Sequence, residues 1–273
     1  MKEETPAKNW NAESREIWDA NAGYWDDHMG DAGNAFHREL VAPAAEKLLA
    51  LRDGESVLEI ACGAGLFARR MAELGAIVTA TDFSPAMIER ARKRTEAVQD
   101  RITFRLLDAT DPGQLGSLPS GRYDAVVCNM AIMDIAEIDP LFAAVSRVLA
   151  PDGRFVFTIC HPCFNTSGAD RVASETDSGG HIAVKHSLSV NRYRTLGVET
   201  GIGIKGQPRP QYYFHRTLAD LLGAAFHHGL MMDGIEEPYF GPPEPGDRAL
   251  GMRHFTETPM LLGVRLRVDI RRR

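Results

Sequence analysis

The chain has 273 residues, 44% of them hydrophobic and 25% charged, as in an ordinary globular protein with one large domain or one domain carrying an insertion. Its net charge of −6 argues against a broad nucleic-acid surface, and the only dense basic run is Arg271–Arg273. No segment approaches the ~18 consecutive apolar residues of a membrane span, and residues 1–6 lack the apolar core of a secretory signal. With only four cysteines, we expect a reduced, cytoplasmic protein that binds neither nucleic acid nor membrane.

Residues 1–52 precede the first predicted strand and carry aromatic and aliphatic side chains spaced among polar ones. This spacing favours one or two amphipathic helices. Such helices either pack on the outer helices of a sheet or close over a bound ligand as a lid. We expect an N-terminal helical lid region, and its large apolar residues are Trp10, Ile17, Trp18, Tyr24 and Trp25.

Strands and helical patterns alternate from position 57 onward. Alternation of this kind gives a parallel sheet with helices on both faces, so we predict an α/β, Rossmann-like, doubly wound sheet. Ligands of such sheets bind beyond the carboxyl ends of the strands, near the point where the strand order reverses. The first five strands are expected at Val57–Ile60, Ile77–Thr81, Ile102–Leu106, Tyr123–Cys128 and Arg154–Ile159.

The second half of the chain departs from this alternation. Residues 161–214 are rich in Gly, Ser, Thr and charge, with a weak strand-like run at His186–Tyr193. We interpret them as an insertion after the fifth strand that covers the substrate site. The sheet is then completed by an antiparallel final strand. The remaining expected segments are a helix at Leu218–Phe226, strands at Met231–Tyr239 and Pro259–Val268, and a core made of residues 53–160 and 215–273.

The most informative segment is the glycine turn Ala61–Gly65, which joins the first strand directly to a helical pattern. Glycine lets backbone approach a ligand closely, and a helix start offers free N–H groups and a positive dipole end. About twenty residues later, Asp82 stands at the end of the next strand, where a carboxylate suits a ribose diol. Together these features predict a nucleoside cofactor.

Three further features narrow the cofactor. Asp108 follows the third strand, where its carboxylate suits an adenine amino group, and Phe83 is placed to lie against the base. Asn129 and Met130 end the fourth strand with a polar side chain and free carbonyls. Carbonyls at that position suit an ammonium group, which a pyrophosphate cofactor lacks.

Taken in order, these segments resemble the class I S-adenosylmethionine-dependent methyltransferases, in particular the bacterial small-molecule branch. The resemblance covers residues 10–160 well and the last helix and two strands moderately. Ala61 stands where the family more often has glycine. The matching motifs are Glu59–Gly65, Thr81–Met87, Leu107–Ala109, Tyr123–Asn129 and Arg147–Gly153.

The resemblance implies S-adenosylmethionine as cofactor and S-adenosylhomocysteine as product. It implies that Gly63 and Gly65 flank the methionine part, that Asp82 holds the ribose hydroxyls, and that Asp108 and Ala109 read the adenine edge. Glu59 would support the turn or receive the amino group indirectly. The full set of expected cofactor contacts is Tyr24, Glu59, Ala61, Gly63, Gly65, Asp82, Phe83, Met87, Asp108, Ala109, Asn129 and Met130.

Methyl transfer is an in-line displacement from an activated sulfonium, so positioning supplies much of the catalysis. A base assists when the acceptor is a hydroxyl or a protonated amine. His161 follows the fifth strand and His215 precedes the late helix, so both are expected near the acceptor. Weaker candidates of the same kind are His37, Tyr24 and Asp134.

Cys160 and Cys163 form a C-x-x-C, but no second pair stands at zinc-binding spacing, so we expect no metal. Two other functions remain open: an NAD-dependent dehydrogenase, since Gly63-x-Gly65-x-x-Ala68 also fits that fingerprint, and a catalytically silent cofactor-binding module. The dehydrogenase reading leaves Asp108 unexplained. We expect a monomer or homodimer that methylates a small organic acceptor, at O or N rather than C or S.

Overall fold

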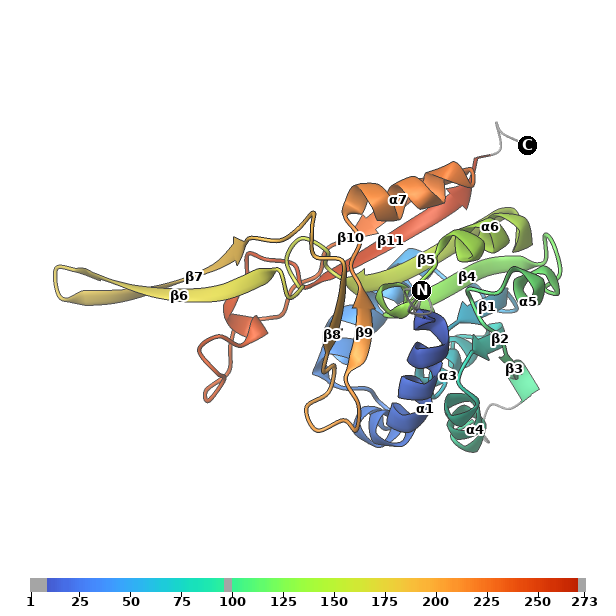
Figure 1. Cartoon of the computed structure of the whole chain (residues 1–273), viewed down its shortest axis with the longest axis horizontal. Helices are drawn as coiled ribbons and strands as arrows, with labels where there is room; N and C mark the ends of the chain where they lie inside the picture. Colours follow the sequence, from blue (N-terminus) through green and yellow to red (C-terminus); the bar gives the residue numbers. More distant parts are fainter. Residues whose placement is uncertain (1–8, 96–99, 270–273) are drawn as a thin grey trace, which may run out of the picture.

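The computed structural model describes residues 9–95 and 100–269; the expectations for the first six residues and for Arg271–Arg273 lie outside the described residues. The described chain forms a seven-stranded sheet in the order β10-β11-β5-β4-β1-β2-β3 (Figure 1). All neighbours pair in parallel except β11, which runs antiparallel to β5 and β10. The predicted doubly wound sheet with an antiparallel final strand is therefore confirmed. The strands are β1 (Ser56–Ile60), β2 (Ile77–Asp82), β3 (Ile102–Leu106), β4 (Tyr123–Asn129), β5 (Leu149–Cys160), β10 (Leu230–Glu236) and β11 (Leu261–Val268).

Helices cover both faces of the sheet, because the central strands are apolar on both sides. In β4, Val126 packs into one buried cluster and Val127 into the other. The cluster around Val126 includes side chains of α5 (Pro112–Gly116), α6 (Asp139–Val148) and α7 (Leu218–His227). The cluster around Val127 includes side chains of α2 (Ala42–Leu49), α3 (Leu66–Glu73) and α4 (Pro85–Lys93).

The start of α4 follows from its sequence. Ser84 caps the helix by accepting a hydrogen bond from the Met87 N–H at 3.1 Å, and Pro85 occupies the first helical position.

The strand expected at Met231–Tyr239 is shorter in the structure, where β10 ends at Glu236. A shift in register between Met232 and Gly234 marks an irregularity in its pairing with β11.

The insertion forms two hairpins. Strands β6 (Ala169–Ser178) and β7 (His181–Val190) make a long ribbon that projects from the body, as Figure 1 shows. The strand expected at His186–Tyr193 therefore begins earlier and ends at Val190. Strands β8 (Val198–Gly201) and β9 (Gln211–Phe214) make a second hairpin beside α1 (Trp10–Met29). Short helical turns complete the chain at η1 (His37–Val41, a π-helix), η3 (Ile132–Asp134) and η4 (Met252–His254).

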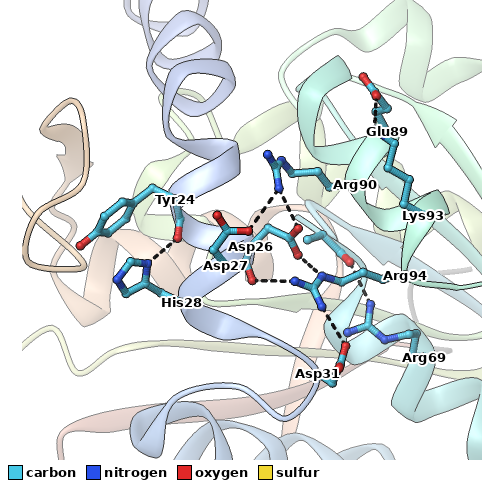
Figure 2. Close-up of polar contacts among 11 residues, drawn as sticks. Tyr24, Asp26, Asp27, His28, Asp31, Arg69, Glu89, Arg90, Lys93 and Arg94 are labelled. Atoms are coloured by element: carbon cyan, nitrogen blue, oxygen red, sulfur yellow. Dashed lines mark hydrogen bonds and ion pairs between the residues drawn. The ribbon is translucent and has the colours of Figure 1, made fainter.

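The N-terminal helix α1 is held to α4 by a partly buried ion-pair network (Figure 2), which we call the α1 latch. The buried Asp26 carboxylate accepts from Arg90 Nη1 at 2.9 Å and from Arg94 Nε. Arg94 also pairs with Asp31 at 2.8 Å.

None of the described helices combines the length and the apolar character needed to cross a bilayer.

Replacing Asp26 with Asn is expected to lower the free energy of unfolding by on the order of 2 kcal/mol, because both arginines lose the charge that neutralises them at a partly buried position. Urea unfolding followed by tryptophan fluorescence measures this change. The matched control is Glu89→Gln, which breaks an exposed pair with Lys93 on α4 and should leave stability unchanged. Equal stability of the Asp26→Asn variant and the wild type would contradict the latch.

Candidate active site

A cavity of about 630 Å³ opens at the carboxyl ends of the parallel strands. It has the size of a typical ligand site and lies where the strand order reverses, between β1 and β4. One end is formed by the glycine turn and the loops after β2 and β3. The other end is formed by η3, the end of β5, and the β8–β9 hairpin. The ribbon β6–β7 contributes no residue to the lining.

The glycine turn adopts the backbone conformation that its sequence permits. Gly63 and Gly65 have φ of +54° and +74°. A Cβ on Gly65 would meet Ala91 at 3.1 Å, whereas one on Gly63 would meet nothing within 4 Å, so the space beside Gly63 is open to the cavity. Ala61 also has a positive φ, +56°, although it carries a Cβ. This strained position is the one where the family more often has glycine.

Asp82 ties the turn to the end of β2. Its Oδ2 accepts from the Gly63 N–H and its Oδ1 from the Ser84 N–H, each at 2.9 Å. Burial raises the pKa of Asp82 to about 6, although these two backbone donors oppose the rise. Each oxygen keeps a second lone pair, so the carboxylate can still accept from ligand hydroxyls.

Glu59 on β1 lines the cavity with an unsatisfied oxygen. The residue is 2% exposed, and its Oε2 has no hydrogen-bond partner within the part of the chain that the structure describes. Burial and the nearby Asp82 raise the pKa of Glu59 to about 8, while Arg69 lowers it. A buried carboxyl without a partner is costly, so this oxygen is suited to a ligand group.

Asp108 closes the far end of the same half of the cavity. Its Oδ1 accepts from the Thr110 N–H at 2.8 Å and its Oδ2 from Asn11 Nδ2 at 2.6 Å. Since Asn11 lies on α1, the N-terminal helix directly contacts this end of the cavity. The other expected residues of this end that line it are Phe83, Met87 and Ala109.

The end of β4 brings two more expected residues to the cavity. Asn129 Oδ1 accepts from Thr158 Oγ1 at 3.0 Å, which leaves its buried Nδ2 without a partner among the described residues. Met130 has a φ of +53° and donates its N–H to the Thr158 carbonyl at 2.8 Å. Two neighbouring strands, β1 and β4, are thus followed by residues with positive φ at the rim of the cavity.

Tyr24 lies outside the cavity lining. Its hydroxyl donates a hydrogen bond to the Lys205 carbonyl, and its ring stacks on that of His28. Figure 2 shows Tyr24 and His28 side by side. Tyr24 therefore joins α1 to the loop between β8 and β9. The structure thus places Tyr24 apart from the other expected cofactor residues that line the cavity.

His161 does not face the cavity either. It is 2% exposed, its Nδ1 accepts from the Cys163 N–H at 3.1 Å, and its Nε2 donates to Glu237 Oε1 at 2.9 Å. Burial lowers the pKa of His161, although Glu237 opposes the change. With both nitrogens engaged, His161 anchors the loop after β5 and, unlike His215, is not placed at the cavity.

His215, which follows β9, lines the cavity. Its Nε2 donates to the Tyr193 carbonyl at 2.7 Å, so the lone pair of the neutral ring is on Nδ1. The adjacent Arg216 donates to four backbone carbonyls, two of them from residues 135 and 136. Arg216 thereby fixes the loop that contains η3 against β9.

Two residues that ranked below His161 and His215 in the sequence also line the cavity and have unsatisfied polar atoms. Asp134 Oδ1 and His37 Nδ1 are buried without a partner in the described chain. Burial raises the pKa of Asp134 well above its ordinary value and lowers that of His37 to about 4.

The sequence did not indicate Tyr213, which also lines the cavity and whose hydroxyl accepts a hydrogen bond from Gln211 Nε2 at 3.0 Å. Tyr213 lies in the insertion, where no motif identifies it.

The described residues contain no group of three or more His, Cys, Asp or Glu placed to hold a metal ion. The four cysteines are free thiols. Cys160 lines the cavity, but burial raises its pKa to about 12, so it is a thiol at neutral pH rather than a nucleophilic thiolate.

Replacing Ala61 with Gly is expected to raise the free energy of unfolding by up to about 1 kcal/mol, because glycine adopts positive φ without steric cost. Ala64→Gly in the same turn is the matched control, since the φ of Ala64 is not positive. There the added chain entropy of the unfolded state should lower stability by about 0.5–1 kcal/mol. Chemical unfolding of the two variants distinguishes these signs, and shifts in the same direction would refute the strain at Ala61.

Residues 58–157 match the protein family described as "Methyltransferase domain". A demethylmenaquinone methyltransferase from Tropheryma whipplei is 35% identical over 113 residues, which cover 41% of this chain and 45% of that protein. A ubiquinone biosynthesis O-methyltransferase from Xanthomonas oryzae pv. oryzae is 32% identical over 101 residues, covering 37% and 41% respectively. The chain thus spans less than half the length of these curated relatives.

The fold of this chain is also similar to that of solved methyltransferase structures. The crystal structure of an S-adenosylmethionine dependent methyltransferase from Mesorhizobium loti matches with a TM-score of 0.61 at 24% identity, over 86% of this chain and 98% of that one. The family match also sets aside the dehydrogenase alternative. Residues 58–157 therefore match a methyltransferase domain, and the strand order and the structural likeness show that the chain has the fold of an S-adenosylmethionine-dependent methyltransferase.

Proposed function

We propose that the protein transfers the methyl group of S-adenosylmethionine to a small organic acceptor. The observation that carries this proposal is one continuous cavity with two different halves. Its first half gathers Glu59, Asp82 and Asp108 from the ends of three adjacent strands around an open glycine turn. Its second half, which is lined by Asp134, Tyr213 and His215, leaves room for an acceptor. The relatives named for demethylmenaquinone and ubiquinone biosynthesis support an organic acceptor of low molecular weight.

The residues present fit the cofactor. The unsatisfied Glu59 oxygen and the open space beside Gly63 suit an ammonium group and a chain that passes close to backbone. Asp82 would hold the ribose hydroxyls, and Asp108 with Ala109 would read the adenine edge. Asn129, with its unsatisfied Nδ2, would complete the methionine end. When bound, the cofactor supplies a methyl group already activated on a sulfonium.

The acceptor half supports O- or N-methylation with assistance by a base. Since His161 is directed away from the cavity, we assign the histidine role to His215, whose Nδ1 would take the acceptor proton as the bond to the methyl carbon forms. Asp134 would anchor the acceptor through its buried Oδ1. The β8–β9 hairpin and α1 would enclose both ligands as a lid, and positioning would supply the rest of the acceleration.

Isothermal calorimetry with S-adenosylhomocysteine tests the cofactor half. Asp82→Asn is expected to weaken binding roughly 10- to 150-fold, because a charge-assisted hydrogen bond is worth about 1.5–3 kcal/mol. The matched control is His161→Asn, which should bind S-adenosylhomocysteine as the wild type does while unfolding more easily. Undiminished affinity of the Asp82→Asn variant would contradict the assignment.

Transfer of radiolabelled methyl from S-adenosylmethionine to a panel of small hydroxyl and amine compounds tests the acceptor half. With any acceptor that the wild type methylates, His215→Asn is expected to lower kcat by about 10²- to 10⁴-fold, the usual contribution of a general base. His161→Asn should retain most of the turnover. The reverse order of the two variants would overturn the assignment of His215.

A further inference from the structure

Glu59 lines the proposed cofactor half of the cavity, and no other side chain in the described residues neutralises it directly. It lies on β1, one of the central strands, and its carboxyl group is enclosed on all sides except the cavity. No salt bridge or side-chain hydrogen bond joins it to a cation in the described residues. The titratable or charged groups that surround it are Asp82 on β2, Arg69 on α3, Cys62 in the glycine turn, Cys128 on β4 and, beyond Asp82, Asp19 on α1.

The balance of these groups favours the neutral form of Glu59. Asp82, the nearest acid, disfavours a second negative charge. The one nearby cation, Arg69, directs its Nη1 to the Ala64 carbonyl at 3.0 Å, so it supports the glycine turn and does not bond Glu59. Burial, which has the largest effect, and the nearby Asp82 raise the pKa of Glu59 to about 8, while Arg69 opposes the rise. A buried carboxyl group without a cationic partner favours its neutral, protonated form.

We infer that Glu59 is protonated in the ligand-free protein and gives up its proton when the ammonium group of the cofactor binds beside it. The step breaks the O–H bond of the Glu59 carboxyl, releases the proton to solvent, and leaves a carboxylate paired with the ammonium. This inference rests on the proposed function. It makes binding stronger as pH rises toward neutrality, and it lets the site favour ligands with a cationic amino group over neutral nucleosides.

Calorimetry in buffers of different ionisation enthalpy counts the protons released on binding. At pH 7, S-adenosylhomocysteine is expected to release close to one proton per site. The probe 5′-methylthioadenosine, which lacks the amino-acid part, should release almost none. Glu59→Gln should weaken binding of S-adenosylhomocysteine and abolish the release. Asp108→Asn is the matched control, because it removes a different cavity carboxylate and should weaken binding while keeping the release.

A second measurement separates proton release from a structural role. Since folding raises the pKa of Glu59, the contribution of this residue to the stability of the wild type falls as pH rises from about 4.5 to about 8. The Glu59→Gln variant carries no such penalty, so without ligand its Tm should exceed that of the wild type, by a margin that widens between pH 5 and pH 8. Binding of S-adenosylhomocysteine without proton release, or release that persists in Glu59→Gln, overturns this inference alone. Failure of S-adenosylhomocysteine to bind in any buffer overturns the proposed function with it.

Discussion

The site depends on one buried carboxylate whose two oxygens join separate segments of backbone. Asp82 accepts one hydrogen bond from Gly63 in the glycine turn and one from Ser84 at the start of α4. The Ser84 hydroxyl in turn donates to Asp19 of α1. Because a buried carboxylate is stable only when its hydrogen bonds are made, this chain of contacts fixes the turn, the end of β2 and the N-terminal helix in one geometry.

The positions of the residues in the proposed cofactor half could be predicted from the sequence because they depend on local backbone rules. A buried strand, a glycine turn and a helix start determine where Gly63 and Gly65 lie, and parallel pairing then brings Asp82 and Asp108 to the same edge of the sheet. No side-chain direction had to be known. The sequence also showed that Ala61 departs from the family pattern. Its positive φ explains why glycine is more common there, since glycine adopts this conformation without steric cost.

The acceptor half could not be predicted in the same way, because tertiary contacts set its side-chain directions. His161 stands next to the end of a central strand, yet Glu237, which lies 76 positions away in the sequence, holds its ring outside the cavity. Tyr213 reaches the cavity only because the β8–β9 hairpin packs beside α1 and η3. Composition identified the insertion, but it could not distinguish this hairpin from the projecting ribbon β6–β7.

The positive φ values after β1 and β4 affect the stability of the folded protein. Ala61 and Met130 hold strained conformations beside a carboxyl group that no residue neutralises, so folding without ligand concentrates unfavourable energy at the edge of the cavity. A ligand that binds only the folded state at a hundred times its Kd adds about 2.7 kcal/mol of stability. On the proposed function, S-adenosylmethionine would therefore stabilise the folded protein as well as supply the methyl group.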